Sequence, residues 1–217
     1  MICMPESVHY RRTFLSPLVA KIYDFCVWAA VLGRTRQFRA NVFPFVPGNA
    51  KVAVDIATGT GGVALALKGE FPKLKLFACD LSEQMLAVAE RKAVARNVSI
   101  VFSVQDVAKT SYPSGMADFA VVSLALHEMP HAKRLDVMRE AFRLLRKGGV
   151  FAVCEYHAPK NLLLWIPLLF QFFLFERVDA YSILKEDLQG ELCSVGFRRV
   201  VKKTYYGGMA QIVAGVK

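Results

Sequence analysis

Hydrophobic and polar positions alternate in blocks along residues 51–217. Short apolar runs rich in β-branched residues predict strands, and longer stretches with apolar positions at helical spacing predict helices. The predicted strands are residues 51–57, 74–80, 98–106, 117–126 and 149–156, and the predicted helices are residues 60–71, 82–96, 132–146 and 184–195. Ser82 is expected to cap its helix, and Gly148-Gly149 to end the helix that begins at Ala132.

The alternation of strands and helices defines a fold class. The predicted strands are almost wholly apolar, which is typical of a parallel sheet covered on both faces. Near the C-terminus, residues 197–206 and 209–217 flank Gly207-Gly208 and predict a closing β-hairpin. We therefore expect an α/β protein with a doubly wound, mostly parallel, seven-stranded Rossmann-like sheet, a C-terminal antiparallel hairpin and an N-terminal helical appendage. Ligands of such sheets bind at the carboxyl ends of the strands.

The N-terminal region differs from the rest of the chain. Residues ~15–42 predict helix, and Pro44 with Pro47-Gly48 ends it. We predict two regions, a helical appendage that caps the substrate (1–48) and a core domain (49–217). Within the core, residues 161–183 form an apolar lid segment. Its stretch Leu162–Phe175 is apolar on nearly every side. This favours either a buried core or dimer helix, or a lid over a hydrophobic substrate pocket that also touches the membrane interface.

Composition narrows the choice of partners. The chain has 217 residues, of which 54% are hydrophobic, and a net charge of +10. A basic surface is typical of proteins that bind nucleic acid, an anionic membrane face or an anionic ligand, and the high apolar content favours the membrane. Phe25 and Trp28 stand near Arg34, Arg36 and Arg39, a pattern suited to an anionic leaflet. The alternative is a helix that caps the sheet and exposes its arginines to solvent. Nucleic acid is not expected, because the basic residues are not interleaved with aromatic ones.

The cysteines, the N-terminus and the length of the apolar runs indicate where in the cell the protein is expected. The five cysteines form no CxxC pair, which favours reduced thiols in a reducing cytoplasm. The N-terminus lacks the apolar region of a secretory signal, and no run reaches the ~20 apolar residues that span a bilayer. We expect a cytoplasmic protein, attached peripherally to the inner face of the membrane if the apolar and basic stretches bind lipid. The sequence makes no prediction of oligomeric state.

The sequence HEMPH at His127–His131 matches the H-E-x-x-H pattern of zinc peptidases. That site requires both histidines on one uninterrupted helix. Pro130 lies between them and disfavours helix in Met129, and the preceding residues are strand-like. We therefore expect a loop that leaves the fourth strand, with no metal bound and with His131 facing solvent.

A glycine-rich turn follows the first predicted strand, in the sequence Asp55-Ile-Ala-Thr-Gly-Thr-Gly-Gly62. Glycines let a ligand approach the backbone, and the following helix offers N–H groups to an anion. The turn alone is also compatible with NAD-type binding. However, Asp55 would repel a pyrophosphate and could instead accept a hydrogen bond from a ligand ammonium. Asp80 ends the second strand, where an acidic residue binds ribose hydroxyls.

These residues resemble those of the class I S-adenosylmethionine (SAM) methyltransferases, and more closely those of the ubiquinone/menaquinone C-methyltransferase group. The resemblance rests on VDIATGTGG, ACDLSEQMLAVAERKA, QDV, LRKGGVFAVCEY, the C-terminal LCSVGFRRVVKKTYYGGMAQIVAG and the upstream VAKIYDF. It covers most of residues 18–217. It is interrupted after the fifth strand, where that group carries a longer insertion and this chain has a compact apolar segment.

The resemblance implies a set of residues that bind SAM. Asp55, Ala57, Thr58, Gly59, Thr60 and Gly61 would surround the amino-acid half. Asp80 would bind the ribose, with Leu81 and Ser82 beside the adenine and Asp106 and Val107 facing the adenine amine. Ser123 and Leu124 would close the site, and Tyr23 would reach it from the N-terminal helix. For Asp106, a turn-forming role is an equally good alternative.

Methyl transfer from SAM also requires a group that takes a proton from the acceptor. His127 follows the fourth strand and titrates in a suitable range. Glu128 is adjacent, and Glu155 ends the fifth strand. These three residues are the catalytic candidates, with His127 first; the alternative for His127 is a loop histidine that only shapes the pocket.

The sequence as a whole predicts a SAM-dependent methyltransferase that releases S-adenosylhomocysteine (SAH). The expected acceptor is hydrophobic and membrane-associated, either a quinone-like ring or a phospholipid amine. The alternatives are a soluble small-molecule O- or N-methyltransferase and a SAM-binding scaffold or regulator without methyl transfer.

Overall fold

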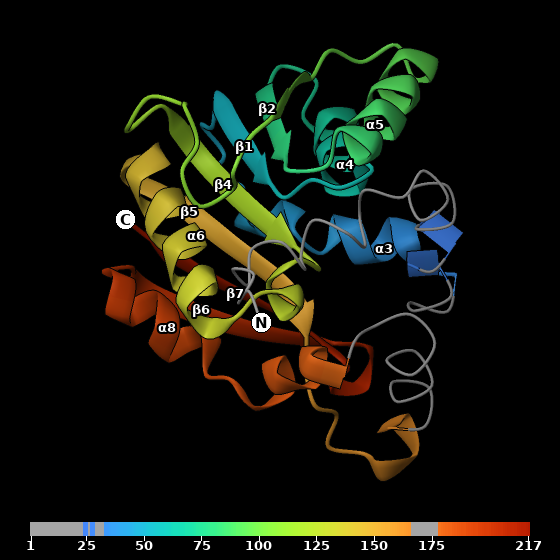
Figure 1. Cartoon of the computed structure of the whole chain (residues 1–217), viewed down its shortest axis with the longest axis vertical. Helices are drawn as coiled ribbons and strands as arrows, with labels where there is room; N and C mark the ends of the chain where they lie inside the picture. Colours follow the sequence, from blue (N-terminus) through green and yellow to red (C-terminus); the bar gives the residue numbers. More distant parts are fainter. Residues whose placement is uncertain (1–23, 26, 29–32, 166–177) are drawn as a thin grey trace, which may run out of the picture.

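A computed structural model describes residues 24–25, 27–28, 33–165 and 178–217 (Figure 1). Its strands are β1 (Val52–Ile56), β2 (Lys75–Asp80), β3 (Val101–Val104), β4 (Ala117–Ser123), β5 (Leu145–Tyr156), β6 (Arg198–Tyr205) and β7 (Ala210–Val216). Its α-helices are α3 (Thr35–Ala40), α4 (Gly62–Glu70), α5 (Glu83–Ala95), α6 (His131–Leu144) and α8 (Leu188–Val195). Short 3-10 helices are η1 (Phe43–Phe45), η2 (Leu126–Glu128), η3 (Leu162–Leu164), η4 (Val178–Lys185) and η5 (Tyr206–Gly208).

The strands form one seven-stranded sheet in the order β3-β2-β1-β4-β5-β7-β6. The pairs from β3 to β5 are parallel, whereas β7 pairs antiparallel with both β5 and β6. The predicted fold class is confirmed, including the C-terminal hairpin. The strand order reverses between β1 and β4, and ligands of doubly wound sheets bind at that point.

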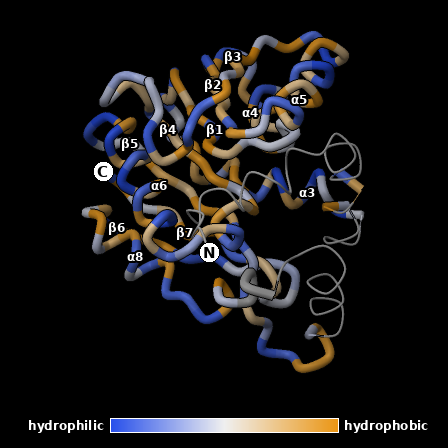
Figure 2. The backbone as a smooth tube through the Cα atoms, viewed as in Figure 1, coloured by the Kyte–Doolittle hydropathy of each residue, from blue (hydrophilic) through white to orange (hydrophobic). Residues whose placement is uncertain are grey.

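Helices cover both faces of the sheet (Figure 1). On one face, Ile56, Val122 and Val153 pack with residues of α6 and α8, such as Met138 and Leu192. On the other face, alternate residues of the same strands pack against α4 and against Val42, which precedes β1. Figure 2 shows the central strands as largely hydrophobic. Burial on both faces explains why these strands contain almost no polar residues.

Several predicted element boundaries are wrong. The helix that begins near Ala132 ends at Leu144 rather than at Gly148-Gly149, because the chain enters β5 at once. A register shift in the β4–β5 pairing then accommodates residues 146–149, where Gly148 has φ +80°. The predicted helix 184–195 is divided into the end of η4 and α8. The predicted strand 117–126 ends at Ser123, since Leu124 has φ +50°.

Half of the N-terminal helix predicted for residues ~15–42 lies outside the described residues. In its described part, Gly33 has φ +79° and interrupts the helix before α3 begins at Thr35. Most of the predicted lid also lies outside, because residues 166–177 are not described. Within the described residues, no helix has both the length and the apolar character needed to cross a bilayer.

Candidate functional site

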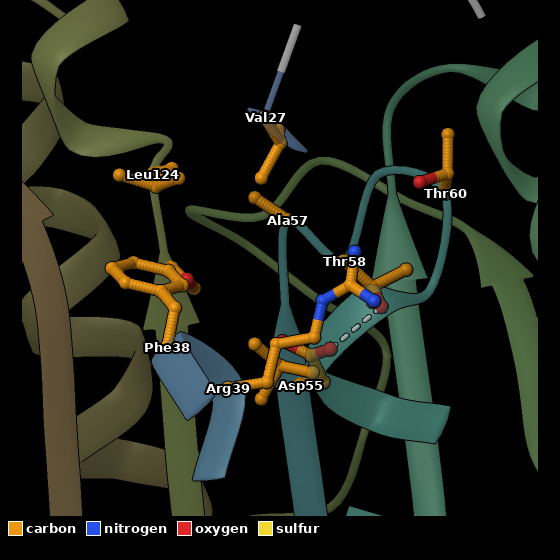
Figure 3. Close-up of a pocket in the computed structure, with 11 residues that line it drawn as sticks. Val27, Phe38, Arg39, Asp55, Ala57, Thr58, Thr60 and Leu124 are labelled. Atoms are coloured by element: carbon orange, nitrogen blue, oxygen red, sulfur yellow. Dashed lines mark hydrogen bonds between the residues drawn. The ribbon is translucent and has the colours of Figure 1, made fainter. Parts of the chain in front are cut away.

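A pocket opens where the strand order reverses. The residues that follow β1 and β4 bound it, because parallel neighbours end at the same edge of the sheet. Its lining residues are Val27, Phe38, Arg39, Asp55, Ala57, Thr58, Thr60, Gly62, Val63, Ser123 and Leu124 (Figure 3). Six of these were predicted to bind the cofactor, so the structure brings Asp55, Ala57, Thr58, Thr60, Ser123 and Leu124 to one place.

Strained backbone borders the pocket on both sides. Ala57 directly after β1 has φ +56°, and Leu124 directly after β4 has φ +50°. Non-glycine residues rarely adopt this left-handed conformation, which costs roughly 1–3 kcal/mol in sparsely populated regions and is concentrated at functional sites. The surrounding sheet therefore holds both strand ends in a conformation that shapes the pocket and lowers the stability of the fold.

The conformation of the glycine loop requires glycine at two positions, Gly59 and Gly61. Gly59 and Gly61 have φ +54° and +77°. A Cβ on Gly61 would lie 2.9 Å from the Cβ of Ala89 in α5, so this position also lacks room for a side chain. Asp80 Oδ2 accepts the Gly59 N–H at 2.7 Å, and thereby fixes the loop to the end of β2.

Asp55 lies beneath the loop and is 1% exposed. Its Oδ2 accepts the Thr58 hydroxyl at 2.7 Å and the Ala64 N–H at 3.0 Å. Burial raises the pKa of Asp55 to about 7, and the two hydrogen bonds oppose the rise only in part. A carboxyl group with this pKa is close to half protonated at neutral pH and would ionise fully beside a bound cation.

This raised pKa predicts a pH dependence of stability. Between the ordinary pKa of ~4 and about 7, folded Asp55 keeps a proton that the unfolded chain releases. The free energy of unfolding should therefore fall as pH rises through this window, and most of the loss should occur by pH 7. Urea unfolding at pH 5, 6, 7 and 8 should show a steeper fall for the wild type than for Asp55→Asn, whose amide oxygen can accept the same hydrogen bonds. Parallel curves for the two proteins would contradict this.

The end of β2 forms the second part of the site. Asp80 Oδ1 accepts the Ser82 N–H at 2.9 Å, while Oδ2 binds the loop. Burial raises the pKa of Asp80, and its backbone hydrogen bonds oppose the rise. Ser82 is the N-cap of α5, as predicted, and accepts the Met85 N–H. Leu81 lies between them and is half-buried.

Asp106 and Val107 follow β3 and have structural partners of their own. Asp106 Oδ1 accepts the Ala108 N–H at 3.0 Å, which makes a turn, and both oxygens contact Lys133 Nζ at 2.9 and 3.0 Å. The Val107 side chain is buried in the core, so only its backbone could contact a ligand. The turn-forming role of Asp106 is present in the structure, and its role in adenine binding stays a prediction.

The third wall of the pocket comes from the N-terminal region. Val27, Phe38 and Arg39 line it, and Figure 3 shows Arg39 extending from α3 toward Thr58. The sequence did not identify these residues as part of the site. Arg39 was grouped with Arg34 and Arg36 as a membrane-facing cation; this is wrong for its side chain, which is only 19% exposed. Tyr23, also predicted to bind the cofactor, lies outside the described residues.

Two of the three catalytic candidates, His127 and Glu155, form a buried contact. His127 Nδ1 is 2.8 Å from Glu155 Oε1, and the side chains are 3% and 0% exposed. Glu155 Oε2 also accepts the N–H groups of Leu126 and His127, and Oε1 that of Tyr156. The other ring nitrogen of His127, Nε2, is 3.7 Å from Glu128 Oε1. None of the three is among the described residues that line the pocket.

The HEMPH sequence occupies the backbone expected for it. Residues 126–128 form η2, Pro130 is the N-cap of α6, and His131 begins that helix with a side chain that is 57% exposed. His127 and His131 therefore do not share a helix face. Among the described residues, no group of histidine, cysteine or acidic side chains could hold a metal ion.

The site fits a nucleoside joined to an amino acid. Asp80 offers a half-buried carboxylate near the loop for vicinal hydroxyls, and the glycines of the loop let a ligand approach the backbone. Among the described residues that line the pocket, Asp55 is an acid and Arg39 a cation, so the two could face the ammonium and the carboxylate of an amino acid. A dinucleotide would instead place a pyrophosphate next to Asp55, which its charge disfavours.

Comparison with known proteins agrees with this geometry. Residues 53–149 match a family model described as a methyltransferase domain. Demethylmenaquinone methyltransferase of Thermus thermophilus is 32% identical over 109 residues, 50% of this chain and 49% of that protein. A ubiquinone/menaquinone biosynthesis C-methyltransferase of Geobacter sulfurreducens is 25% identical over 220 residues, 92% of this chain and 85% of that protein. Three relatives above 30% identity are matched over 49% to 61% of their own length, so the chain spans less than two thirds of them.

Solved structures share the fold. A SAM-dependent methyltransferase from Archaeoglobus fulgidus superposes with a TM-score of 0.66 at 15% identity, covering 90% of this chain and all of that one. At this identity the likeness concerns the architecture alone.

Proposed function

We propose that this chain, which carries a methyltransferase domain and has the fold of the SAM-dependent methyltransferases, transfers the methyl group of SAM to a hydrophobic acceptor at a membrane surface. The observation that carries the proposal is the pocket at the strand-order reversal, where the glycine loop, Asp55 and Arg39 meet. The quinone-like ring is the favoured acceptor, because the named sequence relatives act in menaquinone and ubiquinone synthesis.

The residues divide the work of binding as follows. SAM supplies an electrophilic methyl group on a sulfonium. Asp80 would hold the ribose hydroxyls while it keeps the loop fixed through Gly59. Asp55 and Thr58 would face the ligand ammonium, and the raised pKa of Asp55 would fall on contact with that positive charge. Ala57 and Leu124, held in strained conformations, would exclude water from the point of transfer.

His127 and Glu155 would handle the proton of the acceptor. When Nδ1 donates to the buried Glu155 carboxylate, Nε2 becomes the basic nitrogen, and the imidazolium formed on protonation is stabilised by the same carboxylate. Glu155 is fixed by three backbone N–H groups, so it orients the imidazole without moving. Since His127 is buried, the acceptor or a local opening must expose Nε2 during the reaction.

Apolar side chains and cations on the surface support a membrane-bound acceptor. Phe25, Trp28, Leu162 and Leu163, which we call the docking face, are 62%, 50%, 81% and 72% exposed. The rings of Phe25 and Trp28 stack at 5.7 Å. Figure 2 shows η3 as a hydrophobic stretch beside a hydrophilic one. Large exposed apolar side chains of this kind are typical of binding surfaces rather than of solvated ones.

Cations lie near the docking face. Arg34 and Lys160 are exposed and adjacent in sequence to its two halves. Lys202 and Lys160 are close enough to His157 to lower its pKa, although burial is the larger cause. Apolar side chains that enter the interface beside lysine and arginine are the pattern of peripheral binding to anionic lipid.

The function is tested by incubating the protein with isotopically labelled SAM and a membrane lipid extract, followed by mass spectrometry of lipids and nucleosides. Label should appear in a lipid-soluble product together with SAH. If label appeared only in water-soluble metabolites, the acceptor would be a soluble small molecule and not a lipid. SAM binding without SAH formation would indicate a regulator instead of an enzyme.

Membrane attachment predicts a specific loss on mutation. The wild type should float with anionic liposomes at low salt, and Leu162→Asp/Leu163→Asp should lower the floating fraction several-fold, because two charges would enter the apolar interface. Val94→Asp is the matched control, since Val94 is 80% exposed on α5, away from the docking face. Wild type that stays with the pellet, or equal flotation of the double variant, would refute this attachment.

A further inference from the structure

Arg39 places a positive charge inside the pocket rather than on the surface. Its side chain is 19% exposed and lines the cavity with Thr58 and Thr60. A Cβ built on Gly62 would lie 2.8 Å from Arg39 Nε and 2.9 Å from its Cζ and Nη2. The guanidinium therefore lies against the first residue of α4, in space that only a glycine leaves open.

Among the described residues, Arg39 and Lys92 both pair with one carboxylate, that of Asp24. Asp24 Oδ1 accepts the Thr60 hydroxyl at 2.9 Å, and the Asp24 carboxylate forms a close ion pair with Lys92. Lys92 also donates to the Thr60 carbonyl at 3.1 Å. Arg39 Nη2 is 3.8 Å from Asp24 Oδ1, a longer contact than that of Lys92. Within this cluster one carboxylate thus faces two cations, and its tighter pairing is with Lys92.

We propose that Arg39 recognises the carboxylate of the amino-acid half of the cofactor and thereby selects amino-acid-bearing nucleosides. This rests on the proposed function, which places that half in this pocket. Asp55 and Arg39 then form a complementary pair of charges for an ammonium and a carboxylate. Arginine carries five N–H donors in a planar fork, so it can keep its contact with Asp24 and still bind a ligand carboxylate.

The contact also links cofactor binding to the N-terminal region. Arg39 stands on α3, and Asp24 precedes it in the same region, whereas Thr60 and Lys92 belong to the loop and α5. A ligand held by Arg39 therefore adds a bond across this junction. The wall of the pocket and the ligand stabilise one another.

Two ligands distinguish recognition of the carboxylate by Arg39 from a general effect of Arg39 on nucleoside binding. SAH carries the carboxylate, and 5′-methylthioadenosine has the same nucleoside and sulfur without the amino-acid group. Calorimetry on the full chain should give Arg39→Met an SAH affinity roughly 10- to 100-fold lower than wild type. Its affinity for 5′-methylthioadenosine should stay within about twofold, and Arg39→Lys should recover part of the loss. Arg96→Met, which removes an equal charge from the exposed end of α5, should leave both affinities unchanged.

The possible results are distinct. An SAH affinity in Arg39→Met within twofold of wild type overturns the inference and leaves the proposed function standing. An equal loss for both ligands assigns Arg39 to the structure of the pocket instead. Wild type that binds neither ligand overturns the proposed function and this inference with it.

Gly62→Ala tests the role of Arg39 in a second way, because it displaces the arginine side chain without removing it. Gly62 has no positive φ, so alanine fits the backbone and favours the helix, but its Cβ would push the flexible end of Arg39 aside. The variant should be at least as stable as wild type and should lose SAH affinity. In the Arg39→Met background it should have little further effect. An additive loss would show that the new methyl group blocks the ligand directly and would count against the role of Arg39.

Discussion

Asp80→Asn is expected to lower the affinity for SAH by about 100-fold or more. The carboxylate accepts the N–H groups of Gly59 and Ser82 at 2.7 and 2.9 Å, one with each oxygen. An asparagine keeps one of these bonds and turns an NH2 group toward the other N–H, which leaves a buried donor unsatisfied. It also removes the charge that would hold the ribose. Since hydrogen bonds to charged groups contribute roughly 1.5–3 kcal/mol each, the two losses together reach the stated effect.

The measurement is calorimetric titration with SAH, accompanied by thermal unfolding. Glu83→Gln is the control, because Glu83 is an exposed carboxylate three residues further along the chain and should behave as wild type. The unfolding temperature of Asp80→Asn should fall modestly, as the loop loses one bond. Binding within a few-fold of wild type would remove Asp80 from the cofactor site.

His127→Ala is expected to lower turnover by roughly 100-fold or more while SAH binding stays near normal. His127 and Glu155 contact each other outside the lining of the pocket, and Glu155 follows Cys154, which pairs with the lining residue Ser123. Glu155→Gln should also slow the reaction, because an amide orients the ring without stabilising an imidazolium. In Glu155→Gln the pH–rate profile should shift along the pH axis, a change that loss of packing alone would not produce.

His131→Ala is the matched control for this experiment. His131 lies four residues further on, is largely exposed, and contacts Glu191 at 3.4 Å on the far side of α6. It should retain turnover. Circular dichroism and thermal unfolding of His127→Ala are needed beside the kinetics, since the ring also packs edge-on against Tyr156 at 4.9 Å. Normal turnover in folded His127→Ala would exclude His127 as the base.

Much of the fold follows from local patterns in the sequence. The side chains of strands β1, β2, β4 and β5 are apolar on both faces of the sheet, so the composition of these segments is enough to predict that they are buried. The boundaries that failed depend on tertiary contacts. Leu124 ends β4 early because it turns into the pocket with positive φ, and β5 begins early because residues 146–149 form an irregularity against β4. Neither event has a local signal of its own.

The sequence predicted those candidate site residues whose positions depend only on where a strand ends. Asp55 and Asp80 lie near the ends of β1 and β2, and the glycine loop follows β1, so their meeting at one edge is a consequence of parallel pairing. Arg39 is different, because its place in the pocket depends on how α3 packs against α4, and a cluster of arginines after an apolar helix gives no sign of that. The pairing of His127 with Glu155 depends on β4 and β5 being neighbours, which consecutive strands often are.

The wall that Val27, Phe38 and Arg39 supply has an evolutionary consequence. The matched methyltransferase domain begins at residue 53, so this wall is encoded upstream of it. Changes in the upstream segment can reshape the entrance to the pocket without disturbing a single strand of the sheet. Since Arg39 is the residue that we propose binds the cofactor carboxylate, a new leading segment would have to keep a cation at that place, whereas Val27 and Phe38 could change. For engineering, Val27 and Phe38 are therefore the lining positions to vary while Arg39, Asp55 and Asp80 are kept.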